Sequence, residues 1–264
     1  AERAAILATP EIPALRSVRT FVEALSEYEA GVDRHLYVLN HLFPADGETF
    51  RAVVDACRNH GFRSINLDLI YGLPNQTVAG FARTLEIVIA MRPDRLAVYS
   101  YAHLPDMFKA QRQLDASLLP DAETKLALLQ LAIETLTAAG YVYIGMDHFA
   151  LPDDELAQAQ ERGGLHRNFM GYTTHADSDL IGLGVSAISH IGESYSQNPR
   201  DLVVWAAALD AVRLPVFRGM RMDADDEVRA DLIQSLMCQG EVRVRAFEER
   251  HGMRFAEYFA DDLQ

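Results

Sequence analysis

The hydrophobic pattern of the chain shows, from about residue 48, an apolar helix face followed by an apolar strand. Between residues 48 and 60, apolar side chains recur at a spacing of three and four, and Gly61 follows as a helix stop. Residues 65–71 form a nearly continuous apolar run that breaks at Gly72, which is typical of a parallel strand buried on both faces. The run carries one acid, Asp68. Since ligand sites in such folds gather where strands end, Asp68 is a candidate ligand residue; the alternative is a buried acid satisfied by neighbouring backbone or a basic side chain.

The same order of helix and strand recurs twice downstream. Thr77 opens a helical stretch, and residues 96–99 then read as a strand that runs into polar and aromatic residues. Residues 120–123 place a proline and acids where helix starts prefer them, and residues 141–145 form a third strand that ends in residues 146–149. The alternation predicts an α/β fold with a parallel sheet, either a closed or partial barrel or a doubly wound sheet. No G-x-G-x-x-G follows any of these strands, so a dinucleotide-binding domain has no direct support.

Length and charge narrow the class of protein. A chain of 264 residues with 49% hydrophobic content can bury a sizeable core in one large or two smaller domains. The formal net charge of -14 argues against nonspecific nucleic-acid binding and against anionic membrane surfaces. No apolar run is long enough to span a bilayer and no signal-peptide pattern is present, which predicts a cytoplasmic location with neither nucleic acid nor membrane as partner.

The sequence contains two cysteines, Cys57 and Cys238. Two cysteines cannot form a disulfide framework or a four-cysteine metal site by themselves. Cys57 lies on the apolar side of the helix at residues 48–60, so we expect it in the core.

The last third of the chain is predicted to be mainly helical. Residues 198–201 start one helix and Asp223 starts another. We expect both helices to face the core through their apolar residues, which are Leu202, Trp205 and Leu209 in the first and Val228, Leu232, Ile233 and Leu236 in the second. Further on, apolar stripes that need packing partners are formed by Phe247, Phe255, Tyr258 and Phe259.

Four long blocks of the sequence resemble one family. They are INLDLIYGLPNQT from residue 65, PDRLAVYSYAHLP from residue 93, GYVYIGMDHFALPDDELAQAQ from residue 140 and LHRNFMGYTTHADSDLIGLGVSAIS from residue 165. Together, and in this order, they are similar to oxygen-independent coproporphyrinogen III oxidase (dehydrogenase), a radical S-adenosylmethionine (SAM) enzyme of haem biosynthesis. The resemblance covers about residues 46–264.

The resemblance implies a fold and a reaction. The fold would be a partial parallel (β/α) barrel of radical SAM type over residues 46–195, followed by a mainly helical C-terminal domain over residues 196–264. The family oxidatively decarboxylates two propionates of coproporphyrinogen III to vinyl groups, giving protoporphyrinogen IX. It uses a 4Fe-4S cluster, a reducing electron donor and a SAM-derived 5'-deoxyadenosyl radical. In such an enzyme the protein mainly positions and shields the reactants, since the difficult chemistry belongs to the cofactor.

Matched positions assign three SAM contacts. Asp68 looks like the SAM-binding acid of the family, which could accept from ribose hydroxyls or from the amino end of the cofactor. Ala102 looks like a residue that packs beside SAM through its backbone, and Ile188 like an apolar SAM contact. The alternatives from the residues alone are a tight turn at Ala102 and a core position at Ile188.

Other matched positions bear on a second ligand. Met170 follows Phe169 where the family often has a glutamine, and a thioether cannot replace an amide as hydrogen-bond donor and acceptor, so binding of a second SAM is in doubt. His148, His166 and Arg167 are candidate partners for propionate carboxylates. A solvated or structural role for each of them remains open.

Residues 1–45 depart from the family. The three closely spaced cysteines that hold the iron-sulfur cluster are absent, and Phe43 stands where the SAM pocket has an arginine. Residues 35–38 resemble the strand before the cysteine motif, and residues 14–30 read as an amphipathic helix. We therefore expect a divergent N-terminal segment, a truncated C-terminal domain and a chain that is inactive by itself.

Three functions stay open from the sequence. The first is a part of the anaerobic coproporphyrinogen oxidase. The second is a haem or porphyrin carrier related to the enzyme, although the His-Asn and Tyr-Trp signature of such carriers is absent. The third is a noncatalytic α/β module that contacts another protein.

Overall fold

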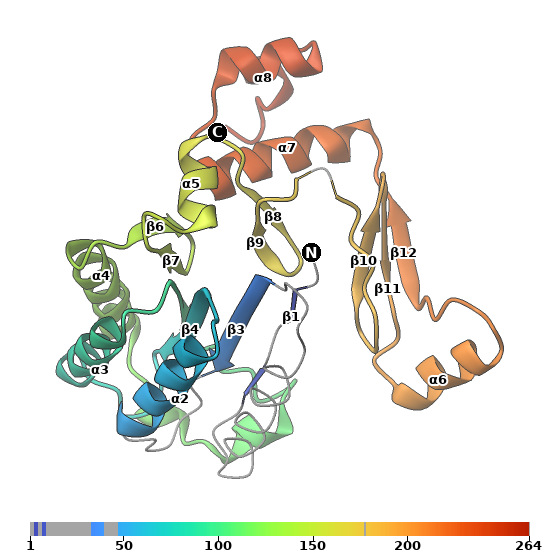
Figure 1. Ribbon diagram of the computed structural model, residues 1–264. Helices are drawn as coiled ribbons and strands as arrows, with labels where there is room; N and C mark the ends of the chain where they lie inside the picture. The colour runs from blue at the N-terminus through green and yellow to red at the C-terminus, as the bar shows by residue number, and fades with distance from the viewer. Residues whose placement is uncertain (1–2, 5–6, 9–32, 40–46, 177, 264) are drawn as a thin grey trace. The chain divides into compact units, whose positions relative to one another are not determined.

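The computed structural model describes residues 3–4, 7–8, 33–39, 47–176 and 178–263 (Figure 1). The chain divides into two compact units, Ala1–Gln158 and Ala159–Gln264, and each is described by itself. The predicted helix at residues 14–30 and the position of Phe43 lie outside the described residues, and the predicted domain boundaries after residues 45 and 195 stay predictions. Within the described ranges, no helix is both long and apolar enough to cross a lipid bilayer.

Unit 1 is built on one mixed sheet. Its strands are β1 (Arg3–Ala4), β2 (Leu7–Ala8), β3 (Asp33–Leu39), β4 (Ser64–Tyr71), β5 (Arg95–Ser100), β6 (Val142–Gly145) and β7 (His148–Ala150). They lie in the order β1-β3-β4-β5-β7-β6, and β2 pairs with β3. The neighbours β3, β4 and β5 run parallel, as predicted for the strands of a barrel wall.

Helices alternate with these strands along the chain. They are α2 (Gly47–Asn59), α3 (Val78–Met91) and α4 (Ala122–Ala138), and the short 3-10 turns η1 (Lys109–Gln113) and η2 (Ala116–Leu118) precede α4. The side chain of Thr77 accepts a hydrogen bond from the Gly80 amide and that of Asp121 from the Thr124 amide, so each caps its helix start. These three helices begin and end where the local sequence signals predict.

The core of unit 1 lies between the helices and one face of the sheet. Ile65, Leu67 and Leu69 of β4 are buried in it together with side chains of α2, α3 and α4, and Cys57 is fully buried there as predicted. Because side chains alternate along a strand, Asn66 and Asp68 point to the opposite face of the sheet.

One strand of unit 1 was not predicted. Residues 148–150 form β7, which pairs antiparallel with both β5 and β6 and so lies between them. The chain reverses at Gly145 and Met146, whose φ angles of 142° and 48° lie in the left-handed half of conformational space. The prediction that the third strand simply ends in residues 146–149 was therefore wrong, although β6 still runs in the same direction as β5.

Buried charges at the amino ends of β4 and β5 are paired. Arg95 Nε lies 2.8 Å from Asp154 Oδ2, and the two side chains are 9% and 5% exposed. Asp94 Oδ2 accepts from the Ile65 amide at 2.7 Å and from Arg58 Nη2 at 2.6 Å. These contacts join the amino ends of the two strands and pair the charged groups there.

Unit 2 combines small antiparallel sheets with helices. The strands are β8 (His166–Asn168), β9 (Gly171–Thr173), β10 (Ile188–Ile191), β11 (Ser194–Gln197) and β12 (Arg218–Arg221), and they form the sheets β8-β9 and β10-β11-β12. The helices are α5 (Glu155–Glu161), which spans the boundary between the units in sequence, α6 (Leu202–Asp210), α7 (Ala224–Gln239), α8 (Val244–His251) and α9 (Phe255–Tyr258). Residues 196–264 are thus mainly helical, as predicted.

The aromatic residues of the last helices pack on one another. The ring centroids of Phe247 and Phe255 lie 5.6 Å apart and those of Phe255 and Phe259 lie 4.8 Å apart, and Phe247 and Phe259 are buried. The predicted apolar stripes therefore find their partners within this small cluster.

The predicted core role of the two longer helices of unit 2 was wrong for several residues. In α6, Leu202 is 64% and Leu209 44% exposed, and in α7, Ile233 and Leu236 are more than half exposed. The hydrophobic spacing identified helix faces correctly but could not show whether another element of the chain covers them.

Candidate functional site

Asp68 is held inside β4, on the face of the sheet opposite the helix-packed core. The side chain is 9% exposed, and Asn66 Nδ2 donates to its Oδ1 over 2.6 Å. Burial raises the pKa of the carboxyl, and the bond from Asn66 opposes this in part. The acid lies inside the strand, which continues to Tyr71 as the apolar run at residues 65–71 predicts.

Asp68 keeps capacity to accept hydrogen bonds. Among the described residues it forms no ion pair, and Asn66 is its one side-chain hydrogen-bond partner. A carboxylate offers about four acceptor positions, and among the described side chains only that of Asn66 occupies one of them. The alternative of a buried acid neutralised by a basic side chain finds no support in this part of the chain.

Asp68, Ala97 and His148 lie side by side across the three neighbouring strands β4, β5 and β7. Asp68 is the register partner of Ala97 on β5, and Ala97 is the register partner of His148 on β7. Register partners point to the same face of a sheet, so the small Ala97 separates the acid from an imidazole. The His148 ring also meets the edge of Tyr99, with ring centroids 5.9 Å apart. The sequence singled out His148 but gave no sign that it shares a face with Asp68.

The loop that follows β4 is shaped by a single amide side chain. Gln76 Oε1 accepts from the amides of Gly72 and Leu73 at 2.6 and 3.3 Å, and Gln76 Nε2 donates to the Ile70 carbonyl at 3.3 Å. Gly72 has a φ of 83°, and a Cβ there would lie 3.2 Å from Lys125 Cε. The chain therefore turns sharply at the carboxyl end of the strand that carries Asp68.

Ala102 lies in the exposed loop after β5, and another glutamine fixes it. Gln111 Nε2 donates to the Ala102 carbonyl at 3.1 Å, and Gln111 Oε1 accepts from the Leu104 amide. The Tyr101 amide donates to the Tyr71 carbonyl at 2.8 Å, which ties this loop to the end of β4. The prediction overlooked Gln76 and Gln111, because a glutamine in a polar loop carries no sequence signal for the backbone groups that it will bind.

Asp68 thus lies within β4, whereas Ala102 lies in the loop that follows the neighbouring parallel strand β5. The residue beside Asp68 on β5 is Ala97, and Ala102 follows beyond the end of that strand. A ligand that touches both must be elongated and must lie along β5 toward the carboxyl ends of the strands. This requirement suits a molecule with a nucleoside at one end and an amino acid at the other.

Ile188 lies in unit 2, where it is the half-buried first residue of β10. A Cβ on Gly182 would lie 2.6 Å from the Ile188 carbonyl oxygen, so only glycine allows this close approach. Asn198 Nδ2 donates to the Gly184 carbonyl at 2.7 Å and holds the preceding loop against the sheet. The structure describes the surroundings of Ile188 within its own unit, and its SAM contact stays a prediction.

The β8-β9 hairpin carries the remaining matched residues. Gln234 of α7 accepts from the Arg167 amide at 3.0 Å and donates to its carbonyl, and the Arg167 guanidinium stacks over the Tyr172 ring at 5.0 Å. Arg167 Nη1 is buried without a hydrogen-bond partner among the described residues. At the hairpin turn Met170 is 82% exposed, while Phe169 packs edge-on against Tyr195. Arg167 is therefore held by packing and retains one donor.

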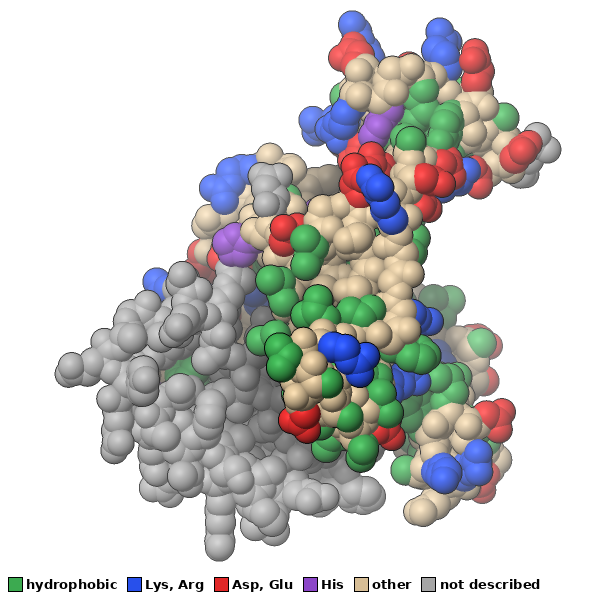
Figure 2. All heavy atoms as spheres, turned by 90° about the vertical axis from the view of Figure 1, so that its right-hand side faces the viewer, with side chains coloured by type: hydrophobic (Ala, Val, Ile, Leu, Met, Phe, Trp, Pro, Cys, Tyr) green, Lys and Arg blue, Asp and Glu red, His purple; other side chains and the backbone are tan. Residues whose placement is uncertain are grey.

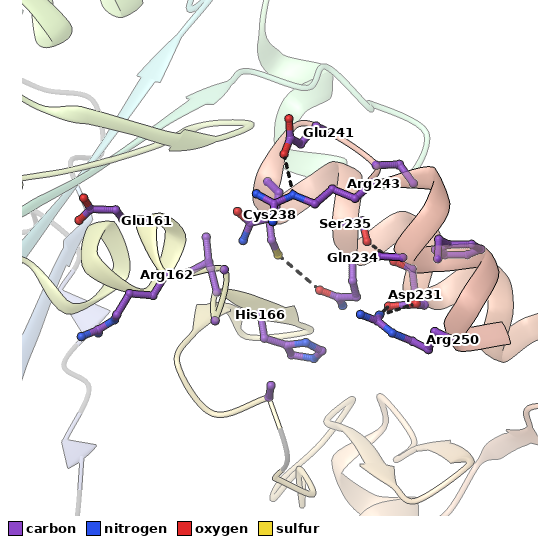
Figure 3. A pocket seen from close by; sticks show the side chains of 18 residues that line it. Glu161, Arg162, His166, Asp231, Gln234, Ser235, Cys238, Glu241, Arg243 and Arg250 are labelled. Atoms are coloured by element: carbon purple, nitrogen blue, oxygen red, sulfur yellow. Dashed lines mark hydrogen bonds and ion pairs between the residues drawn. The ribbon is translucent and has the colours of Figure 1, made fainter.

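Unit 2 also contains an open cavity of about 730 Å³, lined by both polar and apolar side chains, between the turn at residues 161–166 and helices α7 and α8 (Figure 3). Its charged side chains largely pair with one another: Asp231 accepts from Arg250 at 2.7 and 2.8 Å and lies 2.7 Å from His251 Nε2, and Arg243 bonds Glu241 at 3.2 Å. None of the predicted SAM contacts lines this cavity.

The cysteines do not fit an iron-sulfur cluster. Cys57 and Cys238 are both buried, they belong to different units, and burial raises the pKa of each thiol to about 11. A four-iron cluster needs several ionised thiolates at one place. In the described parts of the chain, no three His, Cys, Asp or Glu side chains are arranged to hold a metal ion.

Comparison with known proteins identifies close relatives. No protein-family model matches the chain. Oxygen-independent coproporphyrinogen III oxidase from Pseudomonas aeruginosa is 55% identical over 214 residues, which cover 81% of this chain and 46% of that protein. The enzyme of the same name from Escherichia coli is 49% identical over 219 residues, which cover 83% of this chain and 48% of that protein. The chain thus spans about half the length of the curated relatives it matches.

A solved structure agrees with these sequence matches. Coproporphyrinogen III oxidase from Escherichia coli, a radical SAM enzyme, superposes with a TM-score of 0.86 and 42% sequence identity. The match covers 99% of this chain and 60% of that one. The predicted fold class, a partial barrel of radical SAM type with a mainly helical C-terminal part, is confirmed.

Proposed function

Because the chain belongs to the family of oxygen-independent coproporphyrinogen III oxidases, we propose that it supplies part of the SAM site of such an enzyme. The observation that carries this proposal is the 55% identity over 214 residues to a relative of that name. The reaction would be the oxidative decarboxylation of two propionates of coproporphyrinogen III to vinyl groups, a step of haem biosynthesis. A reducing electron donor would serve the complete enzyme.

The residues of unit 1 suit the polar ends of SAM. Asp68 would accept hydrogen bonds from ribose hydroxyls or from the amino group, since only Asn66 donates to it among the described side chains. Ala102 would contact the ligand through its backbone, in the orientation that Gln111 gives to its carbonyl. In unit 2, Ile188 would form an apolar wall and help exclude water. In a complete enzyme, bound SAM would supply the radical that removes a hydrogen atom from the substrate once a donor has reduced it.

His148 and Arg167 would serve the substrate rather than SAM. His148 shares a face with Asp68, and Arg167 keeps a buried donor that no described residue uses. Either side chain could bind a propionate carboxylate, and Arg could do so with two hydrogen bonds. Met170 offers no amide at the hairpin turn, so this position would not hold a second SAM through hydrogen bonds.

The iron-sulfur cluster does not fit the described residues of this chain. We expect the isolated chain to bind SAM weakly and not to cleave it. After anaerobic reconstitution with iron and sulfide, the chain should show no four-iron absorption and no reductive formation of 5'-deoxyadenosine. A robust cluster spectrum would contradict this expectation.

A chimaera tests the proposed function directly. Residues 46–264 would replace the matching region in the Pseudomonas aeruginosa oxidase, which then supplies the rest of the enzyme. The chimaera should convert coproporphyrinogen III to protoporphyrinogen IX under anaerobic conditions with SAM, and the same chimaera with Asp68→Ala should not. A folded chimaera that binds its cluster but forms no product would refute the proposal.

A further inference from the structure

The described part of the chain buries four polar or charged side chains, and all of them belong to unit 1. They are Asn66 and Asp68 on β4, Arg95 on β5 and Asp154 after β7, each at most 9% exposed. In contrast, arginine and acidic side chains are spread over the surface of unit 2 (Figure 2). Burying a polar group costs free energy unless the group is paired, so each of these four residues needs a reason to be inside.

Arg95 and Asp154 pair with each other and leave Asn66 to Asp68. Arg95 is the register partner of Asn66 on β5, but its Nε donates to Asp154 at 2.8 Å and its Nη2 donates to Glu155 at 3.0 Å. Asn66 Nδ2 instead donates to Asp68 Oδ1 at 2.6 Å. The ion pair therefore anchors the sheet, whereas the amide serves the acid.

The hydrogen bond from Asn66 determines how the Asp68 carboxylate is oriented. Residues two apart along a strand point to the same face, so the amide reaches the acid within a regular β4. The last torsion angle of an aspartate side chain varies broadly, and a donor at Oδ1 restricts it. A donor to an ionised carboxylate forms a strong, charge-assisted hydrogen bond. Asp68 Oδ2, to which no described side chain donates, is thereby held in one direction.

We propose that Asn66 is a positioning residue of the SAM site, whose amide holds Asp68 Oδ1 so that Oδ2 can accept from the ligand. This inference rests on the proposed SAM role of Asp68 and extends it to a residue that does not itself touch SAM.

Asn66 also acts on the charge of the acid. Burial raises the pKa of Asp68, and the hydrogen bond from Asn66 opposes this rise because it favours the ionised form. A carboxylate that is already oriented and ionised binds a donor more tightly than one that must first be ordered and deprotonated. The alternative is that Asn66 only fills space beside the sheet.

A double-mutant cycle tests whether Asn66 acts through Asp68. Isothermal titration calorimetry of the whole chain at pH 7 measures SAM affinity in Asn66→Ala, Asp68→Ala and the double variant. Asn66→Ala should weaken binding about 3- to 10-fold, the range expected for the loss of one hydrogen bond. In the Asp68→Ala background the same substitution should have no further effect, because the group that Asn66 positions is gone.

Two other substitutions control for packing. Asn66→Asp keeps the shape of the side chain, but it removes the amide donor and places a like charge beside Asp68, so SAM affinity at pH 7 should fall at least as far as in Asn66→Ala. Ser64→Ala is the matched control on the same strand and face, since the Ser64 hydroxyl is buried without a partner among the described residues. It should leave SAM affinity unchanged. Circular dichroism shows whether each variant is folded.

The pH dependence of SAM affinity distinguishes positioning from packing. Affinity should fall as the pH drops through the pKa of Asp68, because a protonated carboxyl loses acceptor capacity. Asn66→Ala removes the hydrogen bond that lowers this pKa, so the midpoint of the fall should move to higher pH. A role in packing alone would weaken binding by the same factor at every pH.

Other titratable groups lie on the elements beside Asp68. They are Tyr37 on β3, Arg95 and Tyr99 on β5, His148 on β7, and Asp154 and Glu155 after β7. These groups are the same in the unmodified chain and in Asn66→Ala. The difference between the two pH profiles therefore reports on Asp68 and Asn66.

The SAM affinities of the variants separate this proposal from the proposed function. Unchanged affinity in both Asn66 variants, together with a loss in Asp68→Ala, overturns the positioning role and leaves the SAM role of Asp68 intact. A loss in Asn66→Ala that persists in the Asp68→Ala background also overturns it, as does a pH midpoint that Asn66→Ala leaves in place. Unchanged affinity in Asp68→Ala, or no SAM binding by the unmodified chain, refutes the proposed function and this inference with it.

Discussion

Replacing Asp68 by asparagine separates a ligand role from a structural one. The substitution keeps the size of the side chain and an oxygen that can accept from Asn66, but it removes the negative charge. Burial raises the pKa of the Asp68 carboxyl in the folded chain. A carboxyl with a raised folded pKa contributes stability below its unfolded pKa, and this contribution is lost as the pH rises through the folded pKa. At pH 7 the charged side chain therefore costs stability, and Asp68→Asn should leave the free energy of unfolding unchanged or raise it.

The effect on SAM binding should have the opposite sign. Hydrogen bonds to a charged group contribute about 1.5–3 kcal/mol, and the asparagine places an N–H group where the carboxylate has its second oxygen. We expect SAM affinity to fall by about 10- to 150-fold. Isothermal titration calorimetry at pH 7 measures the affinity, and urea denaturation of the same samples measures stability. Asp153→Asn, at an exposed acid, is the matched control and should change neither.

The combination of the two measurements decides the role of Asp68. A variant that is less stable than the parent and binds SAM with the same affinity would show that the acid is structural. The assignment of the strand ends of unit 1 to SAM would then be refuted. A decrease in affinity without a loss of stability is expected only if the carboxylate contacts the ligand.

Four further predictions concern stability and reactivity. Tyr141→Phe should lower the free energy of unfolding, measured by urea denaturation, by about 1–2 kcal/mol, because the buried hydroxyl donates to the Pro93 carbonyl at 2.8 Å. Tyr143→Phe removes an exposed hydroxyl and should lower it clearly less, and equal losses would contradict this reasoning. Arg95→Met should cost about 3–5 kcal/mol by leaving Asp154 buried and unpaired, and Arg245→Met, in an exposed pair with Glu249, should have no measurable effect. Gly182→Ala should destabilise unit 2 by about 1–3 kcal/mol through contact with the Ile188 carbonyl, while Gly164→Ala, where the nearest atom is 3.9 Å away, should be tolerated. Burial raises the pKa of both thiols to about 11, so Cys57 and Cys238 should react slowly with iodoacetamide at pH 8 in the folded chain and rapidly in urea. Fast labelling of the folded chain would show that one of the two thiols is accessible.

Local signals explain why most helices and strands could be predicted. Thr77 and Asp121 bind the backbone a few residues away, so their effect on helix starts can be seen in a short stretch of sequence. The three-residue strand β7 was missed because its turn depends on Met146 adopting a positive φ, which few methionines do.

Contacts between distant residues explain what was not predicted. Gln111 binds backbone groups of the loop that contains Ala102, and Gln234 binds the backbone of Arg167, and neither glutamine forms part of a pattern. The exposure of Leu202 and Leu209 also depends on which elements lie beside α6, and hydrophobic periodicity does not reveal this. Asp68 could be found because an acid within an apolar run is unusual, but its partner Asn66 and its neighbour His148 required the register of the sheet.

The Arg95–Asp154 pair has a consequence for how this protein can evolve. It anchors the sheet at the amino ends of the strands, while the loops with Gly72 and Ala102 occupy the carboxyl ends. Mutations in those loops can alter the proposed SAM contacts without disturbing the anchor. Substitutions should therefore be tolerated more readily at the carboxyl ends of β4 and β5 than at their amino ends. A change in ligand specificity need not be accompanied by a loss of folding.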